Sequence, residues 1–397
     1  MVPRVLEGRL RALARKFPVV TVTGPRQSGK TTLCRAVFPD KPYVSLEAPD
    51  VQAYAREDPR GFLAEYPDGG VLDEVHRVPD LFSYIQTVVD ERPGRGRFIL
   101  TGSANFALLD AVVQSLAGRT ALLTLLPLGF EELRRFPHPP TDVFDVMWRG
   151  SYPALFDRGL EPGDWYPSYV ATYLERDVRT ILRVGDLIAF QTFLRLCAGR
   201  VGQLVNLSAL GADAGVTHAT ARAWLSVLEA GWVVWRLPPF HANVTTRLVK
   251  TPKLHVADTG LVCYILGIRS MDQLRDHPLR GAVFESWVAS EILKARVHRG
   301  LPARLSFFRD RKGAEVDLLV ELARSYVPVE TKSGQTIAAD FFRGLDAFNS
   351  VAAEARPRRD VDAFLVYAGS RRQRRSGVTV LPWSAINSGP WWEPEEV

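Results

Sequence analysis

The sequence contains only three cysteines in 397 residues, Cys34, Cys197 and Cys263, and they stand far apart. A zinc cage or a disulfide framework needs cysteines at short, paired spacings, so the sequence excludes both. We expect each of the three to be a small buried apolar residue.

Long hydrophobic runs are also absent. No run reaches the roughly eighteen apolar residues that a membrane-spanning helix needs. The first residues lack the apolar block and the small-residue cleavage site of a signal peptide. We therefore expect a cytoplasmic protein without a membrane partner.

Charge of one sign is not in large excess. The net charge is +6, and the hydrophobic and charged fractions are 46% and 24%. These values exclude the disordered and fibrous classes and are typical of a globular protein. The basic balance permits a nucleic-acid partner but does not require one. A length of 397 residues predicts two or three domains.

The periodicity of apolar residues divides the chain into three segments and a tail. Residues 1–165 contain short apolar runs separated by helical stretches, which predicts a buried parallel α/β sheet. Residues 166–260 are expected to be helical and then to form a hairpin, and residues 261–385 to begin with a helix and return to strands. An irregular tail, 386–397, follows. The five strands expected in the first segment are 19–23, 43–46, 71–73, 97–101 and 121–125.

The strongest motif is a complete G-x-x-x-x-G-K-[ST] phosphate loop at residues 24–31. A β-rich run precedes it and a helix-compatible run follows it, which is the context that the motif requires. Lys30 is expected to reach the β- and γ-phosphates, and the Thr31 hydroxyl to bind Mg²⁺. The expected nucleotide-binding residues are Gly24, Pro25, Arg26, Gln27, Ser28, Gly29, Lys30, Thr31 and Thr32.

An apolar strand at residues 71–73 ends in two adjacent carboxylates, Asp73 and Glu74. Asp73 is expected to hold Mg²⁺ as a Walker B acid, and Glu74 to polarise the attacking water as general base. The pair favours hydrolysis over phosphoryl transfer to a small acceptor.

Two further positions are candidates for the hydrolytic site. Ser103 or Thr101, after the next strand, could sense the γ-phosphate, or could instead cap a helix. Arg119, just before a strand, could stabilise the transition state in cis or from a neighbouring subunit of a homo-oligomer. A plain surface salt bridge is the alternative for Arg119.

The motifs described so far resemble, in kind and order, those of prokaryotic AAA-type ATPases that carry a C-terminal domain of unknown function. The resemblance extends over Leu-Ala-Gly-Arg at 116–119, Leu-Pro-Leu-Gly-Phe-Glu-Glu-Leu at 126–133, and later stretches at 173–178 and 252–261. It implies an additional-strand P-loop fold, with residues 43–46 as a strand inserted between the Walker A and Walker B strands. Ser28 stands where a valine is more usual. The preference for ATP over GTP is also implied by the family, since no Asn-Lys-x-Asp motif occurs.

Residues 191–257 follow the pattern helix, helix, turn, helix, hairpin, which is a winged-helix layout. Thr217, His218, Thr220 and Arg222 are expected nearer to solvent on the third helix. Such a helix can enter the DNA major groove, but one arginine without asparagine or glutamine is little for base readout. Contact with DNA and a purely structural role both remain open.

A second set of charged residues lies in the third segment. Glu285 is on the expected helix, Asp317 is on a strand, and Glu330 and Lys332 share one face of the next strand. The set resembles the PD-(D/E)xK nucleases, which implies that Asp317 and Glu330 hold a metal while Lys332 orients the water and Glu285 assists. An inactive nuclease fold or surface salt bridges are the alternatives. The basic run 371–375 could follow a phosphate backbone or be a solvated loop.

Three functions remain open at this point. The first is a Mg²⁺-dependent ATPase that acts as a switch or remodeller on DNA, RNA or a protein. The second is an ATP-regulated, metal-dependent nuclease. The third is a DNA-binding regulator for which the nucleotide is only a ligand.

Overall fold

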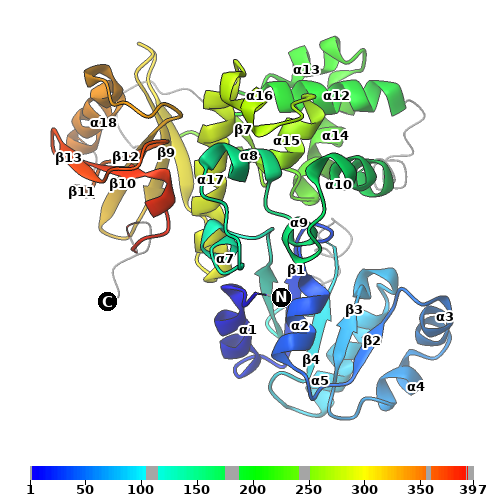
Figure 1. Ribbon diagram of the computed structural model, residues 1–397. Helices are drawn as coiled ribbons and strands as arrows, with labels where there is room; N and C mark the ends of the chain where they lie inside the picture. The colour runs from blue at the N-terminus through cyan, green and yellow to red at the C-terminus, as the bar shows by residue number, and fades with distance from the viewer. Residues whose placement is uncertain are drawn as a thin grey trace.

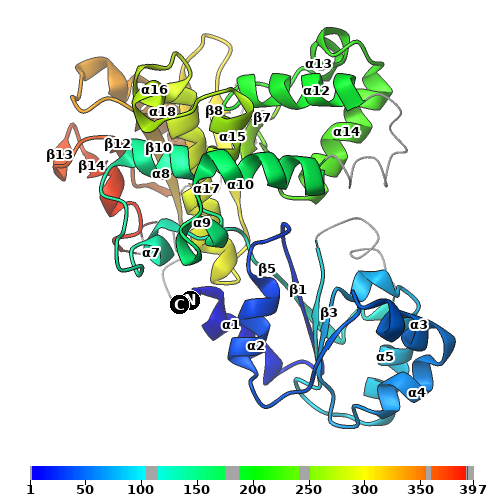
Figure 2. The same cartoon turned by 45° about the vertical axis from the view of Figure 1, so that its right-hand side comes forward.

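The computed structural model describes residues 2–103, 115–174, 187–240, 251–354, 359–389 and 391. Figures 1 and 2 show a small α/β domain, coloured blue to cyan, below a larger part that contains the remaining helices and a second sheet. The end of the first sheet from which the phosphate loop emerges faces the larger part.

The first domain is built on five parallel strands. These are β1 (Val19–Thr23), β2 (Tyr43–Ser45), β3 (Val71–Asp73), β4 (Phe98–Thr101) and β5 (Thr120–Thr124), in the order β2-β3-β4-β1-β5. All five expected strands are confirmed. Residues 16–134 therefore contain the parallel α/β sheet that the phosphate loop requires.

The expected place of residues 43–46 was wrong. The strand between the Walker A strand β1 and the Walker B strand β3 is β4, whereas β2 lies at the outer edge beside β3. Every residue of β4 is buried, while Tyr43 of β2 is exposed. Continuous burial is what a central strand needs, and chain order alone does not fix the place of a strand in a sheet.

Helices cover both faces of this sheet. Helices α1 (Leu6–Ala14) and α2 (Lys30–Val37) pack on one face, where Val20 and Val22 join their core. Helices α3 (Pro49–Glu57), α4 (Pro59–Ala64) and α5 (Leu81–Glu91) belong to the core on the other face. A short 3₁₀ turn, Val75–Arg77, follows β3 directly.

The larger part begins with helices and a two-stranded hairpin. The order helix, helix, turn, helix, hairpin expected for residues 191–257 is confirmed for the described residues. The elements are α7 (Phe130–Leu133), α8 (Val143–Arg149), α9 (Pro153–Asp157), α10 (Pro162–Tyr169) with a π-helical end (Val170–Leu174), α12 (Leu187–Gly199), α13 (Leu207–Asp213), α14 (His218–Ala230), β6 (Val234–Leu237), β7 (Lys253–Val256), α15 (Thr259–Ile265), α16 (Met271–Asp276) and α17 (Arg280–His298).

A mixed sheet completes the larger part, in the order β13-β14-β12-β10-β9-β8 with β11 beside β10. Its elements are β8 (Leu305–Arg309), β9 (Glu315–Glu321), β10 (Ser325–Lys332), a 3₁₀ turn (Ala339–Phe342), α18 (Arg343–Glu354), β11 (Asp360–Val361), β12 (Phe364–Tyr367), β13 (Gln373–Arg375), β14 (Val378–Pro382) and a last 3₁₀ turn (Trp383–Ala385).

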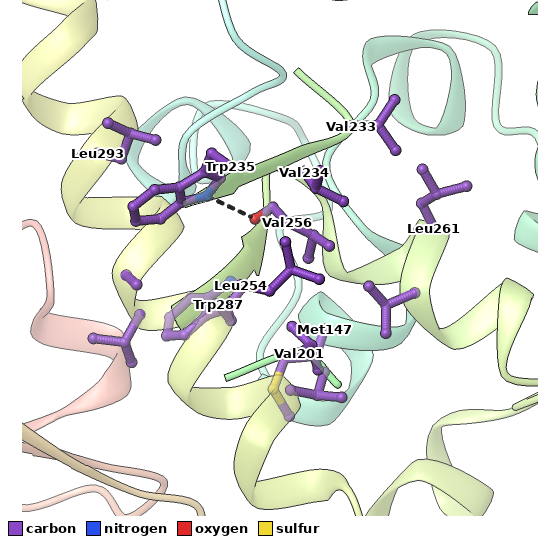
Figure 3. Close-up of a cluster of buried hydrophobic side chains, with 14 of the residues drawn as sticks. Met147, Val201, Val233, Val234, Trp235, Leu254, Val256, Leu261, Trp287 and Leu293 are labelled. Carbon is purple, nitrogen blue, oxygen red and sulfur yellow. Dashed lines mark hydrogen bonds between the residues drawn. The ribbon is translucent and has the colours of Figure 1, made fainter. Parts of the chain in front are cut away.

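One hydrophobic core joins the helices, the hairpin and the mixed sheet, and it runs from Leu126 to Ile386. Figure 3 shows Trp235 of β6 and Trp287 of α17 in this core, with the Trp235 indole N–H donating to the Val256 carbonyl at 3.3 Å. Helix α17 is buried on nearly every side, as a helix at the centre of a domain must be.

Two expectations from composition can be checked directly. Cys34, Cys197 and Cys263 are all buried and unpaired, as expected. Among the described residues, no helix combines the length and the apolar character needed to cross a membrane.

Candidate active site

The phosphate loop follows the carboxyl end of β1, and two glycines set its curvature. Gly24 has φ +142°, and a Cβ at this position would lie 2.1 Å from the Leu125 carbonyl oxygen. Gly29 has φ +94° at the start of α2. A positive φ is accessible to glycine at little cost, so these residues allow a curled loop that ends at the amino terminus of a helix.

Replacement of Gly24 by alanine is expected to unfold or open this loop. The backbone strain alone costs about 1–3 kcal/mol, and the overlap with Leu125 adds to it. We expect a lower melting temperature and loss of nucleotide binding, measured by thermal denaturation and calorimetry. The matched control is Gly8→Ala in α1, where an added Cβ meets nothing within 4 Å. Equal stability of Gly24→Ala and Gly8→Ala would contradict the role assigned to Gly24 in the phosphate loop.

Lys30 is buried and turned into the loop. Its ammonium donates to the carbonyls of Gly24 at 3.2 Å and Pro25 at 2.8 Å. Burial lowers the pKa of Lys30 to about 8, although the nearby Glu74 and Asp73 favour the charged form. The Lys30 ammonium therefore lies inside the phosphate loop. With a pKa of about 8 it is mostly charged at neutral pH and loses its charge at slightly alkaline pH.

Asp73 accepts hydrogen bonds from three hydroxyls. Thr31 Oγ donates to both carboxylate oxygens at 2.9 and 3.0 Å, and the Tyr43 hydroxyl donates at 2.9 Å. Thr101 is the third donor. The structure thus brings together the two residues that the sequence assigned to Mg²⁺, Thr31 and Asp73. The Tyr43 contact was not predicted, because it depends on β2 lying beside β3.

Glu74 adopts a left-handed backbone conformation, with φ 54°, directly after β3. His76 Nδ1 lies 3.1 Å from its Oε2. Burial opposes ionisation of Glu74, but the His76 contact and the charge of Lys30 outweigh it and lower the pKa of Glu74 to about 2. Glu74 is therefore an ionised carboxylate at neutral pH. His76, two residues after Glu74 in the sequence, was overlooked.

The two candidate sensor hydroxyls differ in their contacts. The Thr101 hydroxyl donates to Asp73 and accepts from the Glu74 backbone N–H at 3.4 Å. The Ser103 hydroxyl is buried and has no hydrogen-bond partner within the described part of the chain. Thr101 thus belongs to the Walker B contacts, and Ser103 keeps a hydroxyl available.

Arg119 does not lie near the phosphate loop. Its carbonyl accepts from Val19 N–H at the start of β1, so it stands at the opposite end of the sheet. Five residues of parallel strand separate the two ends, roughly 16 Å. Arg119 binds Asp90 through two contacts, at 2.6 and 2.8 Å. Arg119 therefore cannot act as an arginine finger in its own subunit. Its role in the site of a neighbouring subunit stays a prediction.

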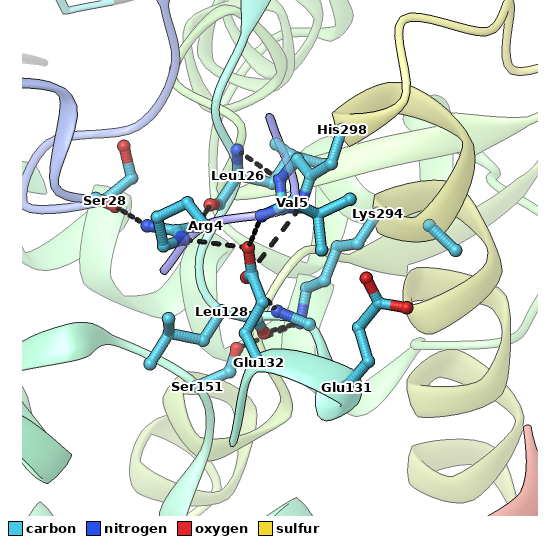
Figure 4. A network of polar contacts seen from close by, with 12 residues as sticks. Arg4, Val5, Ser28, Leu126, Leu128, Glu131, Glu132, Ser151, Lys294 and His298 are labelled. Atoms are coloured by element: carbon cyan, nitrogen blue, oxygen red, sulfur yellow. Dashed lines mark hydrogen bonds and ion pairs between the residues drawn. The ribbon is translucent and has the colours of Figure 1, made fainter. Parts of the chain in front are cut away.

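The phosphate loop is tied to the larger part through Arg4, a residue that the motifs did not indicate (Figure 4). The Arg4 guanidinium donates to the Ser28 carbonyl at 2.7 Å, to the Leu126 carbonyl at 2.8 Å and to Glu132 Oε1 at 3.0 Å. Glu132 on α7 also accepts from the backbone of Val5 and Gly129. Burial opposes its ionisation, but Arg4 outweighs this and lowers the pKa of Glu132 to about 2. This is a buried, fully bonded ion pair.

Helix α17 meets the same segment from the other side. The Leu126 N–H donates to His298 Nε2 at 3.1 Å, and Lys294 Nζ donates to the Leu128 carbonyl at 3.2 Å and to Ser151 Oγ at 3.0 Å. Figure 4 shows both side chains pointing from the helix towards residues 126–132. The segment after β5 is thus held between Arg4 and α17.

Gln27 forms a second contact between the phosphate loop and the larger part. Its side-chain carbonyl accepts a hydrogen bond from the Trp165 indole N–H at 3.1 Å. Trp165 lies on α10 and stacks on Tyr169. Gln27, like Glu74, has a positive φ. The phosphate loop therefore contacts two separate elements of the larger part.

The charged residues expected in the C-terminal segment also come together, around a lysine that was overlooked. Lys253 of β7 lies 2.8 Å from Glu285, contacts Glu315, and is 3.8 Å from Asp317. Burial and the Asp317 charge raise the pKa of Glu285 to about 8. A lysine inside an apolar strand was the available signal in the sequence.

Glu330 and Lys332 form a neighbouring pair at 2.5 Å. Asp317 Oδ2 accepts from the Thr331 backbone at 2.9 Å and from its hydroxyl at 2.7 Å. Burial and Asp317 raise the pKa of Glu330 to about 8. The structure thus brings Glu285, Asp317, Glu330 and Lys332 into one region, as the sequence predicted.

On α14, the expected surface residues Thr217, His218 and Arg222 are exposed and Thr220 is half-buried. The opposite face packs through Trp224 on Phe190 and Phe193 of α12. The helix therefore presents a narrow polar face to solvent.

The residues of the first site fit a nucleoside triphosphate and its metal ion. The Gly24 cradle leaves no room for a Cβ, Lys30 is buried within it, and the paired oxygens of Thr31 and Asp73 are a donor set that suits Mg²⁺. The buried hydroxyls of Ser28 and Ser103 lack a hydrogen-bond partner among the described residues.

Comparisons with known proteins agree with this geometry. Residues 16–134 match the family described as AAA domain, and residues 140–272 and 280–386 match two domains of unknown function, DUF8612 and DUF4143. Among solved structures, the Walker-type ATPase PABY2304 of Pyrococcus abyssi is 17% identical over 66% of this chain and 95% of its own, with a TM-score of 0.46.

Two mycobacterial relatives show the family to which the chain belongs. Mb2031c of Mycobacterium bovis and Rv2008c of Mycobacterium tuberculosis are each 33% identical to this chain over 335 residues, which are 83% of this chain and 73% of theirs. The chain belongs to the family of these mycobacterial proteins, and its residues 16–134 form an AAA-type P-loop ATPase domain.

Proposed function

We propose that the chain is a Mg²⁺-dependent ATPase that acts as a switch or remodeller. Hydrolysis of ATP changes how the larger part meets a nucleic-acid or protein partner. Support for the ATPase comes from the cradle around Lys30 and from the contact between Thr31 and Asp73.

Each residue of the site has a distinct role in this proposal. The loop amides and Lys30 bind the phosphates, and Thr31 and Asp73 hold Mg²⁺, which neutralises phosphate charge when it is bound. Glu74 accepts the proton of the attacking water, helped by an orientation fixed by His76. Ser103 senses the γ-phosphate. Arg119, half-buried at the far end of the sheet, acts only if it is supplied by another copy of the chain.

The observation that carries the switch is the position of Arg4. One guanidinium contacts the phosphate loop at Ser28 and the segment 126–132 that α17 also holds. A change in the loop on nucleotide binding or release must therefore alter contacts of the larger part. Buried interfaces of this kind switch between discrete arrangements instead of deforming smoothly.

The larger part is proposed to contain two partner-binding modules. Residues 166–260 form a winged-helix domain and residues 261–385 a domain with a PD-(D/E)xK nuclease-like fold. The exposed face of α14 and the basic run 371–375 are the proposed contacts. Arg371, Arg372, Arg374 and Arg375 are exposed and form no ion pair with any carboxylate of the described residues, so a phosphate backbone is a suitable partner.

ATP affinity is expected to depend on pH through Lys30. With a pKa of about 8 in the free protein, Lys30 is charged below that pH and loses its charge above it. Binding of the triphosphate then requires uptake of a proton, so affinity falls by up to about tenfold for each pH unit above 8. Calorimetry between roughly pH 7 and pH 10 measures the slope. Constant affinity of the parent protein over this pH range would contradict the prediction.

Replacement of Arg4 by lysine is expected to uncouple the two parts. A lysine keeps the charge beside Glu132 but cannot reach three acceptors at once. We expect ATP to bind with little change, while the nucleotide-dependent hydrogen exchange of residues 126–133 and α17 is lost. Arg11→Lys on α1 is the matched control, because it likewise replaces a guanidinium with three donor contacts, here two to Glu7 Oε1 and one to the Val37 carbonyl. An unchanged exchange response in Arg4→Lys would remove the proposed coupling.

The general test of function is ATP turnover with and without DNA, RNA or candidate proteins. Stimulation by one class of partner supports the switch and identifies the partner. ATP turnover that no partner alters would leave a plain ATPase and refute the switch.

A further inference from the structure

The most unusual group outside the ATPase site is the Lys253 ammonium, which is only 2% exposed. It lies among carboxylates from two different elements, Glu285 of α17 and Glu315 and Asp317 of β9. The resemblance to PD-(D/E)xK nucleases implies a divalent metal bound to Asp317. Lys253 holds a positive charge against the carboxylate where that metal would bind.

We infer that Lys253 is a built-in cation that takes the place of a divalent metal, so that the C-terminal segment binds no catalytic metal and does not cleave phosphodiesters. The cluster then serves to fasten the hairpin to α17 and to the C-terminal sheet.

The backbone of Lys253 is paired on both sides, and its side chain is held by burial and by its carboxylate contacts. Lys253 is paired with Leu237 of β6 and forms a bridge with Leu204. The next residue, Leu254, exchanges hydrogen bonds with Gly202 at 2.7 Å and Gln203 at 2.9 Å.

The Lys253 ammonium also contacts an aromatic ring. Its ammonium lies 5.4 Å from the centre of the Phe307 ring on β8. An ammonium desolvated over an aromatic face gains from the ring as well as from the carboxylates. Lys253 is therefore bonded to α17, β8 and β9 at once.

Each carboxylate of this cluster already contacts a cation or a hydrogen-bond donor, and one oxygen, Glu330 Oε2, is buried without a hydrogen-bond partner among the described residues. Glu315 also binds Arg309 at 3.3 Å, and Glu330 binds Lys332 at 2.5 Å. The second oxygen of Asp317 already accepts two hydrogen bonds from Thr331. Four carboxylates thus face three fixed cations, whereas Mg²⁺ needs an octahedral set of free oxygens. Within the described residues, no group of three or more His, Cys, Asp or Glu side chains is arranged to hold a metal.

The first test is a Mn²⁺ titration of the nucleotide-free, full-length protein, followed by electron paramagnetic resonance. We expect no saturable site at the cluster. Any site that Asp73→Asn removes belongs to the ATPase domain and agrees with the inference. A saturable site that survives Asp73→Asn but is lost in Asp317→Asn or Glu330→Gln overturns it. If the Asp317 and Glu330 variants fail to fold, a saturable site that remains in Asp73→Asn is enough to overturn the inference.

The second test is incubation with single-stranded and double-stranded DNA and with RNA, in Mg²⁺ or Mn²⁺. We expect no cleavage. Cleavage that persists in Lys30→Ala but disappears in Lys332→Ala would overturn the inference, whereas cleavage that survives Lys332→Ala comes from a contaminant and agrees with it. Neither result depends on ATP turnover, so failure here leaves the proposed switch standing.

Discussion

Replacement of Glu74 by glutamine is expected to lower ATP turnover by about 10²–10⁴-fold while ATP still binds. The carboxylate follows β3 directly, and its pKa of about 2 keeps it ionised at neutral pH. Glutamine preserves the size and the backbone turn but cannot accept the proton of water. The protein should therefore accumulate in its ATP-bound state, measured by turnover assays and by calorimetry.

Two controls sharpen this prediction. Lys30→Ala removes the cation that the loop buries, so it should abolish binding and turnover together. Glu65→Gln alters an exposed glutamate of the same domain that contacts Tyr54, and should leave both unchanged. Full turnover in Glu74→Gln would exclude Glu74 as the general base. Loss of binding in this variant would show that Glu74 acts in ligand binding.

Replacement of Lys253 by methionine is expected to lower the free energy of unfolding by about 3–5 kcal/mol. Methionine keeps the volume of the stem but leaves Glu285, Glu315 and Asp317 without the cation that they surround. The cost arises because the half-buried carboxylates lose the cation that binds and balances them. Chemical denaturation measures the difference.

Lys332→Met is the matched control, because Lys332 is more exposed and has one carboxylate partner. Its expected cost is at most about 1 kcal/mol. A double variant, Lys253→Met with Glu285→Gln, should recover part of the lost stability, since it removes the ammonium together with one of the carboxylates that it binds. Equal effects of Lys253→Met and Lys332→Met would refute the central place of Lys253.

The sequence predicted the ATPase domain well because its signals are local. The phosphate loop needs glycines at fixed spacing, and the Walker B strand ends in its acids, so both can be recognised within a few residues. All five strands of the first sheet were found for the same reason. Their order was not, because the place of β2 depends on pairing with β3.

The residues that were overlooked act over long distances in sequence. Arg4 and Glu132 are 128 residues apart, and Lys253 and Glu285 are 32 apart. Lys253 carried a weak signal as a lysine inside an apolar strand, but the partners of both pairs are shown only by the fold. For Arg119 only the role in cis was wrong, because parallel pairing puts its end of the strand away from the phosphate loop. The salt bridge that was the alternative is present with Asp90.

Helix α17 touches both charged regions of the molecule. Glu285 lies near its first turn and His298 is its last residue, so about 20 Å of rigid rod separates them at 1.5 Å per residue. A tilt of roughly 5° about the His298 end displaces the other end by nearly 2 Å over that length. A displacement of this size is enough to break the contact between Glu285 and the Lys253 ammonium. A small movement of the His298 end of α17 would therefore produce a larger movement at the mixed sheet.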